Sequence, residues 1–217
     1  MGLTAILAIL LAYIIGATPF GFLAGKIIKG VDVRDHGSGN IGATNVFRVI
    51  GKPAGIAVFV LDFLKGFLPV YLIHNAAEIG FMAGVGEDFP RWLGILAALA
   101  TILGHNFTFW LGFKGGKGIA TSAGAITALM PGAVGIALVT WIILMVATRY
   151  VAVASIGSAI AIPIAIAVMQ LRSGGIYWPM MAFGIAVASL AIVRHRSNIG
   201  RLRAGTEHRM GTPKTTT

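Results

Sequence analysis

The sequence predicts an all-α polytopic membrane protein with seven transmembrane helices, an N-terminus outside and a cytoplasmic C-terminus. Of its 217 residues, 57% are hydrophobic and 11% are charged, whereas a soluble domain carries about 25% charged residues. The mean hydropathy of the chain is +0.87. So few charges could hardly cover a soluble fold, and a disordered chain would be polar and charge-rich. The composition therefore argues against both classes.

Six apolar stretches approach or exceed the roughly 20 residues that a helix needs to cross the hydrocarbon core. They cover Leu3–Gly25, Pro53–Ile73, Trp92–Phe113, Ile119–Thr148, Val151–Leu171 and Ile176–Val193. The fourth is interrupted by Met130-Pro131-Gly132, so we expect two short helices there and seven in all. A re-entrant segment at this point would reduce the total to five. We expect one integral-membrane domain, residues 1–211, and a disordered tail, residues 212–217.

The distribution of charge decides the sidedness. With the N-terminus outside, fourteen of the seventeen Lys and Arg residues fall on the cytoplasmic side, where loops of membrane proteins carry an excess of both. The segments predicted to be cytoplasmic are 26–52, 112–118 and 194–217, and segment 74–91 is predicted to be external. Lys65 lies within a span, three residues after Asp62, and intramembrane charges are usually paired.

Composition and missing motifs narrow the chemistry. The chain has no cysteine, which excludes disulfides, thiolate metal sites and cysteine nucleophiles. Its net charge of +10 indicates anionic headgroups or a phosphorylated substrate rather than nucleic acid. The G-x-S-x-G and H-E-x-x-H motifs are absent, so serine-hydrolase and zinc-protease chemistry have little support. We expect neither a metal ion nor a cofactor.

The first of three polar segments on the predicted cytoplasmic side, residues 32–48, is rich in glycine. Glycines let the backbone fold back so that its N–H groups converge on an anion. The donors of such a loop would include Ser38, Thr44 and Asn45, and Arg48 could add a two-pronged charged contact. The alternative is an ordinary polar loop with Arg48 at the lipid headgroups.

The second polar segment, residues 104–121, contains Lys114-Gly-Gly-Lys-Gly118 directly before a predicted helix. A glycine-rich turn at a helix N-terminus presents free N–H groups and the positive end of the helix dipole. We therefore expect phosphate binding by Lys114, Lys117 and the glycines Gly115, Gly116 and Gly118. The P-loop pattern requires Ser or Thr after the lysine, and Gly118 stands there instead, so ATP hydrolysis is not indicated. The alternative is a basic turn whose glycines cap a helix.

The third polar segment, residues 193–208, continues the last span. His195 and Asn198 share one face if the helix continues, and histidine is a proton acceptor near neutral pH. A generic basic tail is the alternative. In the preceding span, Ser155 and Ser158 lie near the cytoplasmic end and are either polar side chains at a helix contact or part of a site.

Together, these three segments resemble the signature motifs of the bacterial acyl-phosphate:glycerol-3-phosphate acyltransferases, the PlsY family. The matching residues are Gly37–Arg48, Gly104–Phe107 with Phe113–Thr121, and Arg194–Leu202 with Gly205–Glu207, in the family's order over nearly the whole chain. The resemblance implies a multi-pass enzyme of the bacterial inner membrane with its active site facing the cytoplasm. It would transfer a fatty acyl group from acyl phosphate to the sn-1 hydroxyl of glycerol 3-phosphate, giving lysophosphatidic acid and phosphate.

The resemblance also implies roles for residues of this chain. Ser38 and Arg48 match essential positions of the first motif, and Lys117 with its glycines matches the glycerol-phosphate site. His195 and Asn198 match the polar pair of the third motif, Glu207 matches an acidic position with a structural role, and Ser155 matches a serine of the active-site cavity.

Several alternatives stay open. The acceptor proton goes either to His195 or to the departing phosphate, and an acyl-enzyme on Ser38 or Ser155 is conceivable but lacks an evident Ser-His-acid arrangement. Besides the two substrates and the bilayer, no partner is indicated. A membrane transporter of a phosphorylated anion is the competing function, although the sparse, acidic outer charge fits a phosphate pathway poorly.

Overall fold

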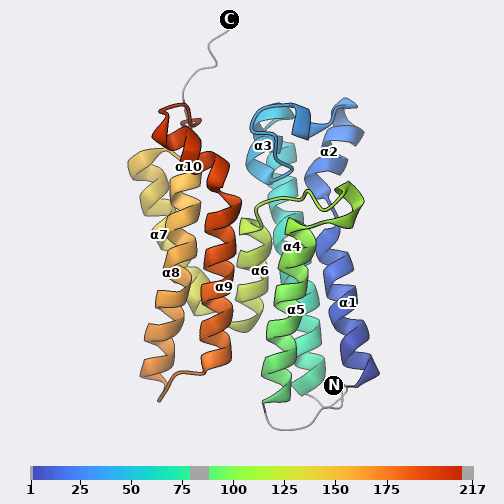
Figure 1. The fold of residues 1–217 in the computed structure, drawn as a ribbon, viewed down its shortest axis with the longest axis vertical. Coiled ribbons are helices and arrows are strands. Elements are labelled where there is room, and N and C mark those ends of the chain that lie inside the picture. The colour runs from blue at the N-terminus through green and yellow to red at the C-terminus, as the bar shows by residue number, and fades with distance from the viewer. Residues whose placement is uncertain (1, 79–87, 212–217) are drawn as a thin grey trace, which may run out of the picture. The chain divides into compact units, whose positions relative to one another are not determined.

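The computed structural model describes residues 2–78 and 88–211, and in this part of the chain every regular element is a helix (Figure 1). The chain divides into two compact units, Met1–Pro131 and Gly132–Thr217. Glu87, which was predicted to be external, and the tail at 212–217, which was predicted to be disordered, lie outside the described residues.

The first unit contains α1 (Leu3–Ala17), α2 (Phe20–Lys29), the 3-10 helix η1 (Val33–Asp35), α3 (Ala43–Val49), α4 (Lys52–Glu78), α5 (Phe89–Asn106), the 3-10 helix η2 (Phe109–Leu111) and α6 (Ile119–Leu129). The first predicted span is divided at Thr18 and Pro19 into α1 and α2. Proline has no N–H and disfavours a helical conformation of the residue before it. Pro19 therefore ends the first helix, whose C-cap residue is Thr18.

Glycines set how closely the helices of the first unit approach. On α1, a methyl group on Gly16 would lie 2.2 Å from the carbonyl oxygen of Thr101 on α5. On α4, a methyl group on Gly66 would lie 2.1 Å from the carbonyl oxygen of Thr121 on α6. Larger residues at these two positions would push the backbones apart, so the glycines bring α5 and α6 against α1 and α4.

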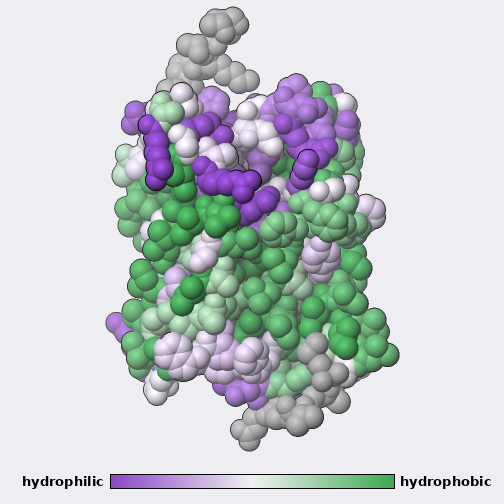
Figure 2. All heavy atoms as spheres, viewed as in Figure 1, coloured by the Kyte–Doolittle hydropathy of each residue, from purple (hydrophilic) through white to green (hydrophobic). Residues whose placement is uncertain are grey.

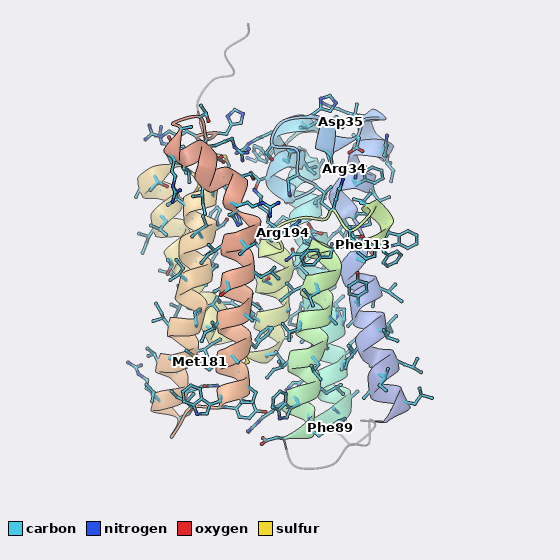
Figure 3. All side chains as sticks on the ribbon, viewed as in Figure 1. Arg34, Asp35, Phe89, Phe113, Met181 and Arg194 are labelled. Atoms are coloured by element: carbon cyan, nitrogen blue, oxygen red, sulfur yellow. The ribbon has the colours of Figure 1, made fainter. Side chains whose placement is uncertain are left out.

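Both polar segments of the first unit lie at one of its ends. In Figure 3, Arg34, Asp35 and Phe113 lie toward one end of the unit, whereas Phe89, at the start of α5, lies at the other. Figure 2 shows hydrophilic side chains gathered over α2 and α3 and hydrophobic ones over the flank of α1. Within this unit, the segments predicted to be cytoplasmic therefore share an end.

The second unit consists of α7 (Pro131–Thr148), α8 (Val151–Arg172), α9 (Trp178–Arg194) and α10 (Arg196–Arg203). α8 packs against α9. The axes of α9 and α10 differ by 53° at His195, where the chain bends. In Figure 3, Arg194 and Met181 lie toward opposite ends of α9.

The chain is a multi-pass membrane protein by the length and composition of its helices. Five helices are long and apolar enough to cross a membrane, or six if the bent pair α9 and α10 is counted as one span. Exposed tryptophans near span ends, Trp92, Trp110 and Trp178, fit the aromatic belts at the two bilayer interfaces.

The structure has the predicted interruption between Ile119 and Thr148. α6 ends at Leu129 and α7 begins at Pro131. The 11 residues of α6 correspond to about 16 Å at 1.5 Å per residue, about half the thickness of a hydrocarbon core. A seventh full-length span is therefore not present among the described helices, and α6 is a half-length segment.

Candidate active site

Asn45 organises the first polar segment. Its side chain is buried, and its amide nitrogen donates to the carbonyl oxygens of Val33, His36 and Asn40 at 2.8, 3.1 and 2.8 Å. Its oxygen accepts from the backbone N–H of Ser38 at 2.8 Å. We expected Asn45 to contact substrate, but its hydrogen-bonding groups are directed at the loop itself. These contacts favour a role in shaping the loop that presents Ser38.

The same segment contains a two-pronged ion pair. The guanidinium of Arg34 donates to both carboxylate oxygens of Asp32, with a shortest distance of 2.6 Å. The hydrogen bond from Arg34 lowers the pKa of Asp32 below its usual 3.8, although burial opposes this shift. Arg48, which matched the first motif, is half-buried in the last turn of α3.

The loop between η2 and α6 is built on glycine for reasons of space. The N–H groups of Gly115 and Gly116 donate to the carbonyl oxygens of Asn106 and His105 at 3.2 and 3.1 Å. A methyl group on Gly115 would lie 2.0 Å from the His105 carbonyl oxygen, and one on Gly116 would lie 2.0 Å from Nε2 of His105. These two N–H groups hold the loop against the end of α5, so the expectation that they bind phosphate needs revision.

Gly118 forms the cap at the start of α6. Its φ of +80° lies in the left-handed region, which favours glycine. The next residue begins α6, so the loop ends at a helix N-terminus, where the positive end of the helix dipole lies. Lys117 is half-buried beside this N-terminus, whereas Lys114 is exposed. Of the two predicted lysines, Lys117 is therefore the better placed for an anion at the helix end.

A buried charged cluster lies next to this loop. Lys65 and Asp62, the intramembrane pair, form an ion pair of 2.7 Å, and both side chains are buried. Nζ of Lys65 also donates to the Thr18 carbonyl oxygen at 2.7 Å, at the break between α1 and α2. Nδ1 of His105 lies 3.7 Å from Oδ1 of Asp62. The ion pair confirms the pairing predicted from the spacing. Nothing in the sequence connects His105 with Asp62, although both are rare residue types within apolar spans.

In the second unit, His195 lies where the chain bends from α9 to α10. The side chain is buried, and Nδ1 lies 2.7 Å from the Ala191 carbonyl oxygen. A carbonyl oxygen can only accept, so this hydrogen bond requires the proton on Nδ1. In the neutral ring, Nε2 is then the nitrogen that can take a proton.

Asn198 and Glu207 contact one another directly. The amide of Asn198 donates to Oε1 of Glu207 at 2.8 Å, and Nε of Arg201 donates to Oε2 at 2.7 Å. Both oxygens of the carboxylate are thus engaged by α10, and Glu207 is itself buried. This geometry fits the structural role expected for Glu207.

Ser155 on α8 is buried and faces α7. The indole N–H of Trp141 donates to its Oγ at 3.4 Å, and Oγ of Ser158 donates to the Ser155 carbonyl oxygen at 3.0 Å. Sequence reasoning missed Trp141, because a tryptophan within a span normally needs no special explanation. Across the described residues, no three His, Asp or Glu side chains are grouped as metal ligands.

Comparison with known proteins gives one consistent result. A model of the family described as glycerol-3-phosphate acyltransferase matches residues 6–205. The chain is 42% identical to the glycerol-3-phosphate acyltransferase of Desulforamulus reducens, with 98% of each chain covered. It is 39% identical to that of Synechococcus elongatus, with 97% of each chain covered.

Two solved structures are also similar. One is a crystal structure of PlsY, an integral membrane glycerol 3-phosphate acyltransferase, in its glycerol 3-phosphate form. It has a TM-score of 0.82 and 38% identity, with 96% of each chain covered. The other is the lysophosphatidic acid form of PlsY, with a TM-score of 0.79 and 37% identity over the same share of both chains.

Proposed function

Since this chain belongs to the glycerol-3-phosphate acyltransferase family, we propose that it acylates the sn-1 hydroxyl of glycerol 3-phosphate to give lysophosphatidic acid, an early step of phospholipid synthesis. The observation that carries the proposal is the full-length similarity to a structure solved in a glycerol 3-phosphate form. The first two motifs that suggested this function lie within residues 6–205, which the family model matches, and the third begins inside this range and ends two residues beyond it, at Glu207.

We propose acyl phosphate as the donor. Acyl-CoA-dependent glycerolphosphate acyltransferases carry an H-x-x-x-x-D pair, and none of the five histidines of this chain is followed by Asp at that spacing. An acyl phosphate is already activated, so the protein has to position the reactants and stabilise charge. Two phosphate groups repel one another, which gives a reason for the basic residues of the motifs.

Within this proposal, Lys117 and Arg48 bind phosphate groups, with Lys114, Gly115, Gly116 and Gly118 completing the basic loop. The three glycines are buried, and side chains added there would displace Lys117.

Two serines and two further residues complete the proposed site. Ser38 and Ser155 hold substrate oxygens. Asn45 and Glu207 shape the segments that carry the reacting groups.

The reaction balances without a cofactor. The sn-1 oxygen attacks the acyl carbonyl carbon, the bond from that carbon to the phosphate oxygen breaks, and phosphate leaves with the bonding electrons. The hydroxyl proton goes to Nε2 of His195, which the hydrogen bond from Nδ1 to Ala191 leaves as the basic nitrogen, with Asn198 beside it on α10. The departing phosphate is the competing acceptor for the same proton.

We further propose that the chain crosses the bacterial inner membrane with the N-terminus outside and the C-terminus and motifs in the cytoplasm. The seven segments are α1 with α2, α4, α5, the half-length α6, α7, α8 and α9. The concentration of Lys and Arg in the three predicted cytoplasmic segments supports this orientation.

A reconstitution assay tests the function. Purified protein in vesicles is given labelled glycerol 3-phosphate with acyl phosphate, acyl-CoA or acyl carrier protein loaded with an acyl chain as donor. We expect lysophosphatidic acid and phosphate in equal amounts with acyl phosphate alone. Product with acyl-CoA alone would overturn the proposed donor. Accumulation of label inside vesicles without any acylation would indicate a transporter and overturn the function.

A further inference from the structure

We infer that Asp62 is a positioning residue for the acceptor-phosphate loop: its carboxylate orients His105, and His105 fixes the loop 114–118 that carries Lys117. The inference rests on the proposed function, because it assigns a role in binding glycerol 3-phosphate. The mechanism above uses neither Asp62 nor His105, and both lie in the first unit together with the loop.

The burial of the charges requires an explanation. Asp62 and Lys65 are 3% and 5% exposed within a helix long and apolar enough to span the membrane. Removing two charges from water costs more than a buried ion pair normally regains, and well-packed apolar residues often stabilise a protein as well or better. Stability alone therefore gives little reason for the pair, which points to a second task for one of its members.

The contacts of His105 identify that task. One side of its ring faces the pair, with Nδ1 3.7 Å from Oδ1 of Asp62, which is an electrostatic contact longer than a hydrogen bond. Its other side faces the loop, since a methyl group added to Gly116 would lie 2.0 Å from Nε2. The His105 carbonyl oxygen also accepts the N–H of Gly116. His105 is therefore in contact with the loop through its ring and its backbone, and a tilt of the ring would move Gly116, the residue before Lys117.

The same turn of α4 also fixes the surroundings of the loop. Lys65 donates to the carbonyl oxygen of Thr18 at the break between α1 and α2, and Gly66 lies against the Thr121 carbonyl oxygen in the first turn of α6. The segment 62–66 thus contacts the break between α1 and α2, the end of α5 and the beginning of α6. Lys65 supplies the compensating charge for Asp62 and a second attachment point for this turn.

The test separates positioning from folding. Asp62→Asn leaves Lys65 as an uncompensated buried charge and is expected to lower the melting temperature. The double variant Asp62→Asn/Lys65→Met removes both charges and is expected to regain much of that loss. In both proteins, the inference requires the KM for glycerol 3-phosphate to rise by about tenfold or more, since small displacements of a binding group cost up to about 100-fold. The KM for the acyl donor and kcat should change little.

A third variant tests whether Asp62 acts through His105. His105→Gln should raise the same KM, and adding it to the Asp62→Asn background should have little further effect, because coupled residues are not additive. Thr101→Val, a nearly isosteric change at a fully buried position one turn earlier on α5, is the matched control and should leave the KM unchanged.

Two outcomes would overturn the inference. One is a wild-type KM in the well-folded double variant, which would make the ion pair a packing element alone. The other is full additivity of the Asp62 and His105 effects, which would disconnect the two residues. The concentration of glycerol 3-phosphate that half-maximally raises the melting temperature gives the same comparison without turnover. If the wild-type protein binds glycerol 3-phosphate but does not acylate it, the proposed function is wrong. The positioning role of Asp62 can still be measured from the binding titration.

Discussion

Asn198 donates a 2.8 Å hydrogen bond to Glu207, and the acceptor lies in the segment after the helix that carries the donor. The contact ties the end of the third motif back onto α10. Arg201 occupies the second carboxylate oxygen, so a single buried carboxylate organises two donors. The position of Asn198, which we propose to act beside His195, therefore depends on a residue without a chemical role of its own.

Replacing Glu207 should accordingly lower the stability of the protein more than its catalytic rate. Glu207→Ala leaves two buried or half-buried donors without their partner, at a cost of about 1–3 kcal/mol for each such group. We expect a lower melting temperature in detergent, with a smaller loss in Glu207→Gln, which retains one acceptor. Turnover per folded molecule should stay close to the wild-type value even though the melting temperature falls. A Glu207→Ala protein with a normal melting temperature and no activity would instead place Glu207 in the chemistry.

Asn45 is predicted to be equally structural. Asn45→Ala removes two N–H donors, which three carbonyl oxygens share, and one acceptor inside the first polar segment, and each full hydrogen bond is worth about 1 kcal/mol net. Asn40→Ala, which removes the single bond from the Gly42 N–H, is the control. We expect limited proteolysis to cleave residues 36–44 faster in Asn45→Ala than in Asn40→Ala. Equal cleavage rates would contradict the role of Asn45 as the organiser of the loop.

Lys117 should contribute mainly to binding of the acceptor. Lys117→Ala removes a charge-assisted contact worth about 1.5–3 kcal/mol, so the KM for glycerol 3-phosphate should rise by about one to two orders of magnitude. Lys52→Ala, at an exposed position that begins α4, controls for the loss of a positive charge. Steady-state kinetics with the acyl donor at saturation give the comparison. An unchanged KM in Lys117→Ala would remove this lysine from the site.

The features that could be predicted from the sequence are those that depend on neighbouring residues. Long apolar runs identified the spans, Met130-Pro131-Gly132 identified the break between α6 and α7, and the spacing of Asp62 and Lys65 identified an ion pair. Each of these features follows from neighbouring residues. The length of α6 was the main difference, because its 11 residues fall short of a full span.

Contacts between distant segments could not be predicted in the same way. The approach of His105 to Asp62 depends on how α4 and α5 pack, and the hydrogen bonds of Asn45 depend on the path of the loop before α3. Glycines that suggested phosphate binding turned out at Gly115 and Gly116 to make room for His105. A glycine-rich motif indicates that the backbone closely approaches another group. Whether that group is a ligand or a side chain such as His105 depends on how the helices pack.

Ser155 is expected to hold a substrate or a neighbouring helix rather than to form an acyl-enzyme. Its contact with Trp141 comes from an indole N–H, which donates and cannot take the hydroxyl proton. We expect Ser155→Ala to lose about tenfold in kcat/KM, close to the 1–1.5 kcal/mol of a lost hydrogen bond, and Trp141→Phe to lose a similar factor. Mass spectrometry of protein quenched during turnover should show no covalent acyl group. An acyl adduct on Ser155 would contradict this prediction.

His195 provides the decisive test of the proton transfer. Its Nδ1 donates to the Ala191 carbonyl oxygen, so in the neutral ring Nε2 is the nitrogen with the lone pair that a base needs. His195→Ala should lower kcat by about 100- to 10,000-fold, the usual contribution of a general base. His195→Gln can form hydrogen bonds but cannot accept the proton, and it should recover little of the loss. The pH profile of kcat/KM should also lose its acidic limb in both variants. If Gln restores near-normal turnover and the profile keeps its shape, His195 orients the substrate and the departing phosphate takes the proton, because no other step of the proposed reaction requires a base.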